Sequence, residues 1–179
     1  MISGTELLSR EAEARRLGSG ITSEAIAGEW WLQQLWSRQG QEQAAAASLL
    51  RSLSACLAIT PVPAAAGSAG LELRNLELRN TVRLGLLELR FTGPGRLSGR
   101  RPLLRFHFER MQLLWAGKPF WQASLPTPSA AKEPFFALIA TQPENGVEMA
   151  PQHSEGEAGG WLAARGRGGG LALWTLRPG

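Results

Sequence analysis

The residues able to do nucleophilic or metal chemistry are few and far apart in the sequence. The histidines are His107 and His153, and the one cysteine is Cys56. A zinc site needs three or four such ligands, so no zinc-binding pattern is present. A cysteine and a histidine can meet in space from distant positions, but Cys56 lies beside an apolar stripe and is interpreted as a core residue. We therefore expect no catalytic residue, no metal and no cofactor.

A glycine-rich segment near the C-terminus could bind an anion. Gly166-Arg167-Gly168-Gly169-Gly170 separates two apolar runs, Trp161–Ala164 and Leu171–Trp174. It is not a Walker loop, because no Lys-Ser or Lys-Thr follows the glycines. A backbone anion nest and an Arg-Gly segment that binds RNA are alternative interpretations. Since glycine reaches positive φ without steric cost, we favour the turn of a β-hairpin, and we expect no nucleic-acid partner.

The composition fits one folded domain with a core. The chain has 179 residues, of which 44% are hydrophobic, and its formal net charge is +4. Lys118 and Lys132 are the only lysines, so 17 of the 19 basic residues are arginines, which suit phosphate and carboxylate recognition. No uncharged apolar run approaches the roughly 20 residues that span a bilayer, and the charged segment 1–17 does not resemble a signal peptide. We expect a protein that is cytoplasmic or peripheral to a membrane.

Helices are predicted in the first part of the chain. Ser3 and Glu6 have the spacing of a capping box, and they begin an N-terminal helical segment within residues 1–27. A second helix is predicted over Glu42–Ile59, inside an insert that spans residues 42–69. Its apolar residues recur at helical period, at Ala46, Leu49, Leu50, Leu53 and Leu57.

Short strands are predicted for most of the remaining chain. Gly28–Trp36 has the aromatic density typical of a strand, and from Leu71 onward apolar and charged residues alternate with the strand period. About seven to nine regularly spaced strands indicate a mainly β fold, an antiparallel sandwich or barrel over residues 28–179. We expect the last hairpin to pair with an earlier strand and close the sheet.

The start of the first strand suggests how one end of a barrel is closed. Trp30, in Gly28-Glu29-Trp30, can plug the barrel end, and an arginine from a late strand can stack on its ring. Arg165 and Arg177 are the candidates for that arginine. We predict that Trp30 and Arg165 close the barrel, a structural role and not a catalytic one.

Four short segments, taken in order along the chain, carry a resemblance to a known family. The sequence resembles the plastid lipid-associated protein (PAP)/fibrillin family, in a form found in cyanobacteria. It departs from the family pattern at Leu35-Trp36-Ser37, where Tyr-Thr-Ser is usual, and at Ala163-Ala164, where an Asp is frequent. The matching segments are Leu7-Leu8 with Leu17-Gly18, Gly28-Glu29-Trp30-Trp31-Leu32, Asn80-Thr81-Val82 followed by Phe106-His107-Phe108, and Trp161 to Trp174 with its Arg165-Gly166.

The resemblance implies a lipocalin-like β-barrel and a non-enzymatic binding function. The ligand would be a lipid, an isoprenoid or another hydrophobic small molecule, and the protein would work at photosynthetic (thylakoid) membranes. An eight-stranded barrel can hold one small ligand. Surface arginines, Arg100, Arg101 and Arg105, would meet anionic headgroups. The ligand-binding residues that we predict are Leu104, Phe106, Phe108, Phe135 and Leu173.

Two other functions stay open from the sequence. A lipocalin-like chromophore lyase or isomerase would need a polar side chain that points into the barrel, and His107 and Glu109 are the candidates. A protein-interaction scaffold would use the basic face of the molecule to bind a partner protein.

Overall fold

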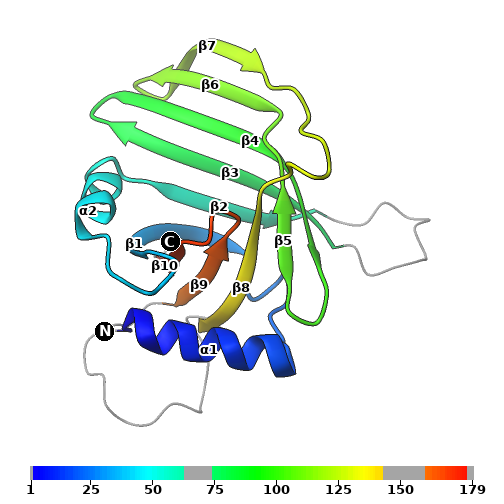
Figure 1. Ribbon diagram of the computed structural model, residues 1–179. Coiled ribbons are helices and arrows are strands. Elements are labelled where there is room, and N and C mark those ends of the chain that lie inside the picture. The colour runs from blue at the N-terminus through cyan, green and yellow to red at the C-terminus, as the bar shows by residue number, and fades with distance from the viewer. Residues whose placement is uncertain (1, 63–73, 143–159, 177–179) are drawn as a thin grey trace, which may run out of the picture.

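The computed structural model describes residues 2–62, 74–142 and 160–176, which form an antiparallel β-barrel accompanied by two helices (Figure 1). The mainly β, lipocalin-like fold predicted from the sequence is confirmed. In chain order the elements are α1 (Gly4–Leu17), β1 (Gly28–Trp36), α2 (Ala44–Ser52), β2 (Cys56–Pro61), β3 (Arg74–Leu84), β4 (Leu87–Ser98), β5 (Leu103–Phe106), β6 (Arg110–Trp115), β7 (Lys118–Ser124), β8 (Phe135–Gln142), β9 (Trp161–Gly166) and β10 (Leu171–Leu176).

Eight of the ten strands in the described residues close the barrel, in the order β1, β2, β3, β4, β5, β8, β9 and β10, with β10 returning to β1. The closing pair is antiparallel, and Leu32 lies opposite Trp174 in its register. The turn before β10 contains Gly169, whose φ is 89°. A residue with a side chain is strained at this φ, so glycine suits the turn. The predicted final hairpin therefore forms and seals the sheet.

The sheet continues beyond the barrel on one side. The second half of the long strand β4 pairs with β5 as part of the barrel wall. Its first half pairs with β6, which lies outside the barrel. The β6–β7 hairpin then extends the sheet outside the barrel wall, next to the β3–β4 hairpin (Figure 1). Leu87 faces Trp115 in the β4–β6 pair, so the tips of the two hairpins lie side by side.

The barrel interior is filled at one end only. Trp30 is buried there, and its indole Nε1 donates a hydrogen bond of 2.8 Å to the carbonyl oxygen of Ile26. Such a bond satisfies the one polar atom of a buried tryptophan. The other buried side chains of this end are Ile21, Ile26, Ile59, Leu76, Leu78, Leu97, Leu104, Leu138 and Leu162.

Helix α1 covers part of the outer face of the barrel (Figure 1). Ser3 Oγ accepts a hydrogen bond of 3.2 Å from the amide of Glu6, as the capping-box spacing predicts. The buried Leu7 packs in a second hydrophobic cluster between α1 and the barrel wall, which we call the outer cluster. Its other buried members are Trp36, Ile139, Ala163, Leu171 and Leu173.

The predicted helix over Glu42–Ile59 is wrong in its second half. Helix α2 ends at Ser52, Ser54 turns the chain with a φ of 48°, and Cys56–Pro61 forms strand β2. Strand β2 pairs with both β1 and β3, so its backbone hydrogen bonds are made on both sides. Pairing of this kind overrides a weak local preference for helix. The rest of the predicted insert, from residue 63 onward, lies outside the described residues.

Candidate functional site

A cavity of about 360 Å³ occupies the end of the barrel that the core does not fill. It lies next to α2, which contributes Leu50 to its wall. The cavity is at the small end of the range typical of ligand sites, which are largely apolar. Its lining residues come from both helical and strand segments and are Leu32, Leu35, Trp36, Gln43, Leu50, Ala55, Cys56, Leu57, Asn80, Val82, Phe106, Phe108, Phe136, Gly166, Gly170, Leu171, Ala172 and Trp174.

A row of aromatic rings forms one wall of this cavity. The ring centroids of Phe106 and Phe108 are 5.4 Å apart, and those of Phe106 and Phe136 are 5.2 Å apart. Phe136 in turn meets Trp174 edge to face, at 5.4 Å. The strand register explains the row, because Leu104 on β5 lies opposite Phe136 on β8 and both strands alternate inward and outward. The wall offers flat apolar surfaces to a ligand.

The cavity has few polar groups with which to orient a ligand. Among the described residues that line it, Gln43 and Asn80 are the only ones with side-chain amides, and Cys56 adds a thiol. None of these described lining residues carries a charged side chain. A buried charge without a partner is costly, so this site favours a neutral, largely hydrophobic molecule with one or two hydrogen-bonding groups.

The structure divides the five predicted ligand-binding residues. Phe106 and Phe108 line the cavity, whereas Leu104 is fully buried in the packed core. Leu173 lies in the outer cluster beneath α1, and Phe135 lies outside the barrel with the Arg105 guanidinium 5.9 Å from its ring centroid. Phe135 and Leu173 thus have the wrong strand parity to face the interior. Their neighbours Phe136 and Trp174 point inward instead, and neither was among the predicted ligand-binding residues.

The predicted contact between Arg165 and Trp30 is not made. Trp30 is in the packed end of the barrel, whereas the Arg165 side chain lies on the outer face of β9. The parity of β9 is the reason, since Leu162 and Ala164 belong to the interior core while Arg165 alternates with them. Arg165 instead connects the barrel wall to helix α1.

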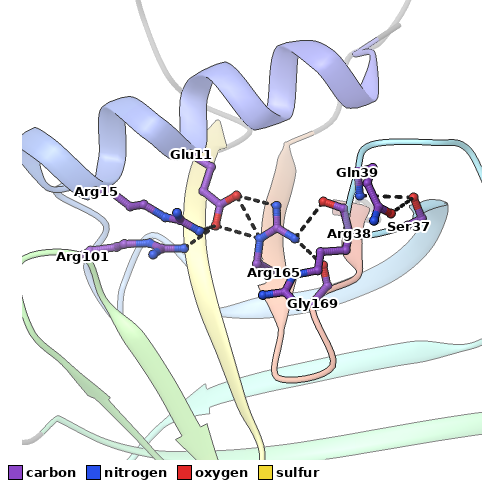
Figure 2. Close-up of polar contacts among 8 residues, drawn as sticks. All are labelled: Glu11, Arg15, Ser37, Arg38, Gln39, Arg101, Arg165 and Gly169. Atoms are coloured by element: carbon purple, nitrogen blue, oxygen red, sulfur yellow. Dashed lines mark hydrogen bonds and ion pairs between the residues drawn. The ribbon is translucent and has the colours of Figure 1, made fainter.

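Glu11 of α1 is the centre of that connection (Figure 2). Arg165 Nε donates to Glu11 Oε1 at 2.7 Å, and Arg165 Nη2 donates to Oε2 at 2.5 Å. Arg101 and Arg15 donate to Oε1 at 2.7 Å and 2.8 Å. The Glu11 side chain is only 4% exposed. Sequence reasoning missed this network, because its partners are up to 154 positions apart.

The Glu11 network predicts a loss of stability in acid. Burial alone raises the pKa of Glu11, but hydrogen bonds and charges from Arg165 and Arg15 outweigh it and hold the pKa below its ordinary value of 4.5. A depressed pKa in the folded state adds stability above the unfolded pKa, and this stability is lost as pH falls from about 4.5 through the folded value. Urea unfolding at a series of pH values should show this loss, with a shallower slope in Glu11→Gln.

The residues proposed for the enzymatic alternative lie away from the cavity. His107 Nε2 is 3.2 Å from Glu109 Oε1, and His107 Nδ1 is 3.9 Å from Glu133 Oε1. Neither His107 nor Glu109 is among the cavity-lining residues. In the described ranges, no three His, Cys, Asp or Glu side chains are grouped so that they could hold a metal ion.

Comparisons of the chain with protein-family models, with curated protein sequences and with solved structures give no match. Of the helices in residues 2–62, 74–142 and 160–176, none has the length and hydropathy needed to cross a bilayer.

Proposed function

We propose that the protein is a non-enzymatic carrier that holds a lipid, an isoprenoid or another hydrophobic small molecule in the barrel cavity. The observation that supports this is the half-filled barrel. One end is packed with aliphatic side chains around Trp30, while the other end keeps an apolar space bordered by Phe106 and Phe136. Since proteins normally fill their interiors to high density, a space of this size points to a ligand.

The cavity is large enough to enclose only part of a long ligand. A space of about 360 Å³ suits a ring system or a short chain, so a long isoprenoid would leave its tail outside the barrel. The amides of Gln43 and Asn80 would hydrogen-bond a carbonyl or hydroxyl group of the ligand. A quinone ring fits this combination of apolar walls and few polar groups.

Protein purified without detergent provides the direct test of the carrier. Solvent extraction followed by mass spectrometry should recover one hydrophobic molecule per chain. Loss of that molecule from a variant with a blocked cavity would link it to the barrel. Native mass spectrometry that shows only the bare chain, together with failure to bind any neutral hydrophobic probe, would exclude the carrier function.

The lyase or isomerase alternative has less support. It needs an acid or base that faces the bound molecule, and the cavity wall formed by the described residues carries no histidine and no carboxylate. The Cys56 thiol lines the cavity, and the part of the chain that the structure describes contributes no histidine to the same lining. We therefore favour binding without catalysis.

We further propose that the carrier works at a membrane surface, as the resemblance to the PAP/fibrillin family suggests for thylakoid membranes. The tips of the β3–β4 and β6–β7 hairpins and strand β7 present large apolar side chains that are between 44% and 66% exposed. Tryptophan and phenylalanine insert well at a bilayer interface. The exposed residues are Leu84, Leu86, Trp115, Phe120 and Trp121.

Replacing two of these aromatic residues should weaken membrane binding. We expect Trp115→Ser with Phe120→Ser to lower the partition into neutral phosphatidylcholine vesicles by at least about tenfold, because each buried aromatic contributes about 1.5–3 kcal/mol. Cosedimentation measures the partition. Leu17→Ser is the matched control, since Leu17 is 58% exposed on α1, away from the hairpin tips. Equal partition of the two variants would contradict the proposal.

A further inference from the structure

A second concave surface lies outside the barrel, between helix α1 and the β9–β10 turn. It has a volume of about 790 Å³ and differs in character from the barrel cavity, because five of its fourteen described lining residues are arginines. We call it the arginine groove. Among residues 2–62, 74–142 and 160–176, its arginines are Arg15, Arg38, Arg101, Arg165 and Arg167, and the one carboxylate that lines it is that of Glu11.

The arginine groove carries a large excess of positive charge. Five guanidinium groups less one carboxylate leave four positive charges on one surface. The whole chain has a formal net charge of +4, so the groove holds an imbalance as large as that of the entire protein. Concave surfaces lined by charge of one sign concentrate ions of the other sign.

Several of these guanidinium groups are held in place by the fold. Arg165 is fixed by Glu11 and also donates to the carbonyl oxygen of Gly169 in the turn. Arg167 Nη2 and Nη1 donate to the carbonyl oxygens of Ala131, at 2.5 Å, and Glu133, at 3.3 Å. Carbonyl contacts position the Arg167 guanidinium without neutralising its charge. Positioned donors lose little freedom on binding a ligand.

Arg38 adds a charge without a counter-ion. A Cβ placed at Gly169 would come within 3.3 Å of Arg38 Cγ and Cδ, so the Arg38 stem lies against the turn (Figure 2). In the described part of the chain, its guanidinium has no hydrogen-bond or ion-pair partner. Its five N–H donors are therefore available to a ligand.

We propose that the arginine groove binds a phosphate group. The planar guanidinium fork matches two phosphate oxygens, and the excess charge suits a group that carries one or two negative charges. A soluble phosphate ester and a lipid headgroup share this chemistry. The site does not depend on the hydrophobic carrier function, since none of the five groove arginines belongs to the described lining of the barrel cavity.

Calorimetric titration of the full chain with inorganic phosphate, at low ionic strength to limit screening, tests the site. We expect saturable binding that Arg38→Gln weakens about tenfold, the effect of losing one charge-assisted hydrogen bond. Arg38→Gln removes no protein contact of the guanidinium, so the fold should remain. Arg110→Gln is the control, because Arg110 is an exposed arginine on β6, outside the groove. Absence of saturable binding, or equal weakening in both variants, would overturn the proposal.

Binding to vesicles with and without phosphatidylglycerol distinguishes a lipid headgroup from a soluble phosphate ester. If the phosphate belongs to a lipid headgroup, phosphatidylglycerol in phosphatidylcholine vesicles should increase binding of the wild-type chain and of Arg110→Gln more than of Arg38→Gln. If it belongs to a soluble ester, free phosphate should bind with the same dependence on Arg38, while phosphatidylglycerol has equal effects on both variants. Both results support a phosphate site, and they assign its ligand differently.

Discussion

Val82→Trp should block the barrel cavity and abolish binding of a neutral hydrophobic probe such as N-phenyl-1-naphthylamine. Val82 lines the cavity and is only half-buried, so a larger side chain can turn into the open space without displacing the packed core. The indole would then occupy the position of the ligand beside Phe108. We expect the affinity to fall by about a hundredfold, since the probe would lose the burial of roughly 100 Å² of apolar surface.

Fluorescence titration of the probe measures this effect, and thermal unfolding shows whether the barrel is intact. Filling an empty apolar space without strain should leave the melting temperature unchanged or raise it. Val62→Trp is the matched control, because Val62 is exposed just after β2, away from the cavity lining. Unchanged probe affinity in a folded Val82→Trp protein would show that the probe binds elsewhere and would remove the main support for the carrier.

The architecture could be predicted because its signals are local. Alternation of apolar and charged residues identifies the strands, and glycine at the β9–β10 turn identifies the final hairpin. Segment 56–61 escaped prediction because both of its faces are covered. Cys56, Leu57, Ala58 and Ile59 are all buried, so no alternation remains to distinguish this strand from the end of an apolar helix.

The cavity could be predicted only in part, for a related reason. Phe106 and Phe108 alternate with polar residues, so their inward direction follows from the sequence. Leu173 and Trp174 are adjacent and both buried, because α1 covers the outer face where Leu173 lies. An apolar residue therefore occupies each face, and the sequence does not say which one meets the ligand.

Arg165 illustrates what the sequence does not contain. Its role depends on Glu11, which lies 154 positions away, and no local pattern connects the two residues. The sequence predicted an aromatic partner for Arg165 at the barrel end, but the desolvation of a guanidinium is better compensated by the buried carboxylate of Glu11 on the outer side of the barrel wall. The pairing of Arg165 with Glu11 follows only from the packing of α1 on the barrel.

Glu11→Gln should strongly destabilise the protein by removing the charge that holds α1 to the barrel. Glutamine keeps the size of the side chain but leaves Arg165, whose side chain is 13% exposed, without its counter-charge. Removing one partner of a largely buried ion pair costs about 3 kcal/mol, and the loss is shared with Arg101 and Arg15. Equilibrium unfolding in urea at neutral pH should report this decrease in the free energy of unfolding.

The same helix provides a matched control for this substitution. Glu6 also pairs with an arginine four residues later, at 2.8 Å, but Glu6 and Arg10 are 43% and 44% exposed. An exposed pair of this kind contributes at most about 0.5 kcal/mol, so Glu6→Gln should hardly change the unfolding curve. If the two variants lost equal stability, general helix electrostatics would explain the effect, and Glu11 would not be the residue that anchors α1. A selective loss in Glu11→Gln would show instead that the anchor depends on the buried carboxylate and the arginines of the barrel wall.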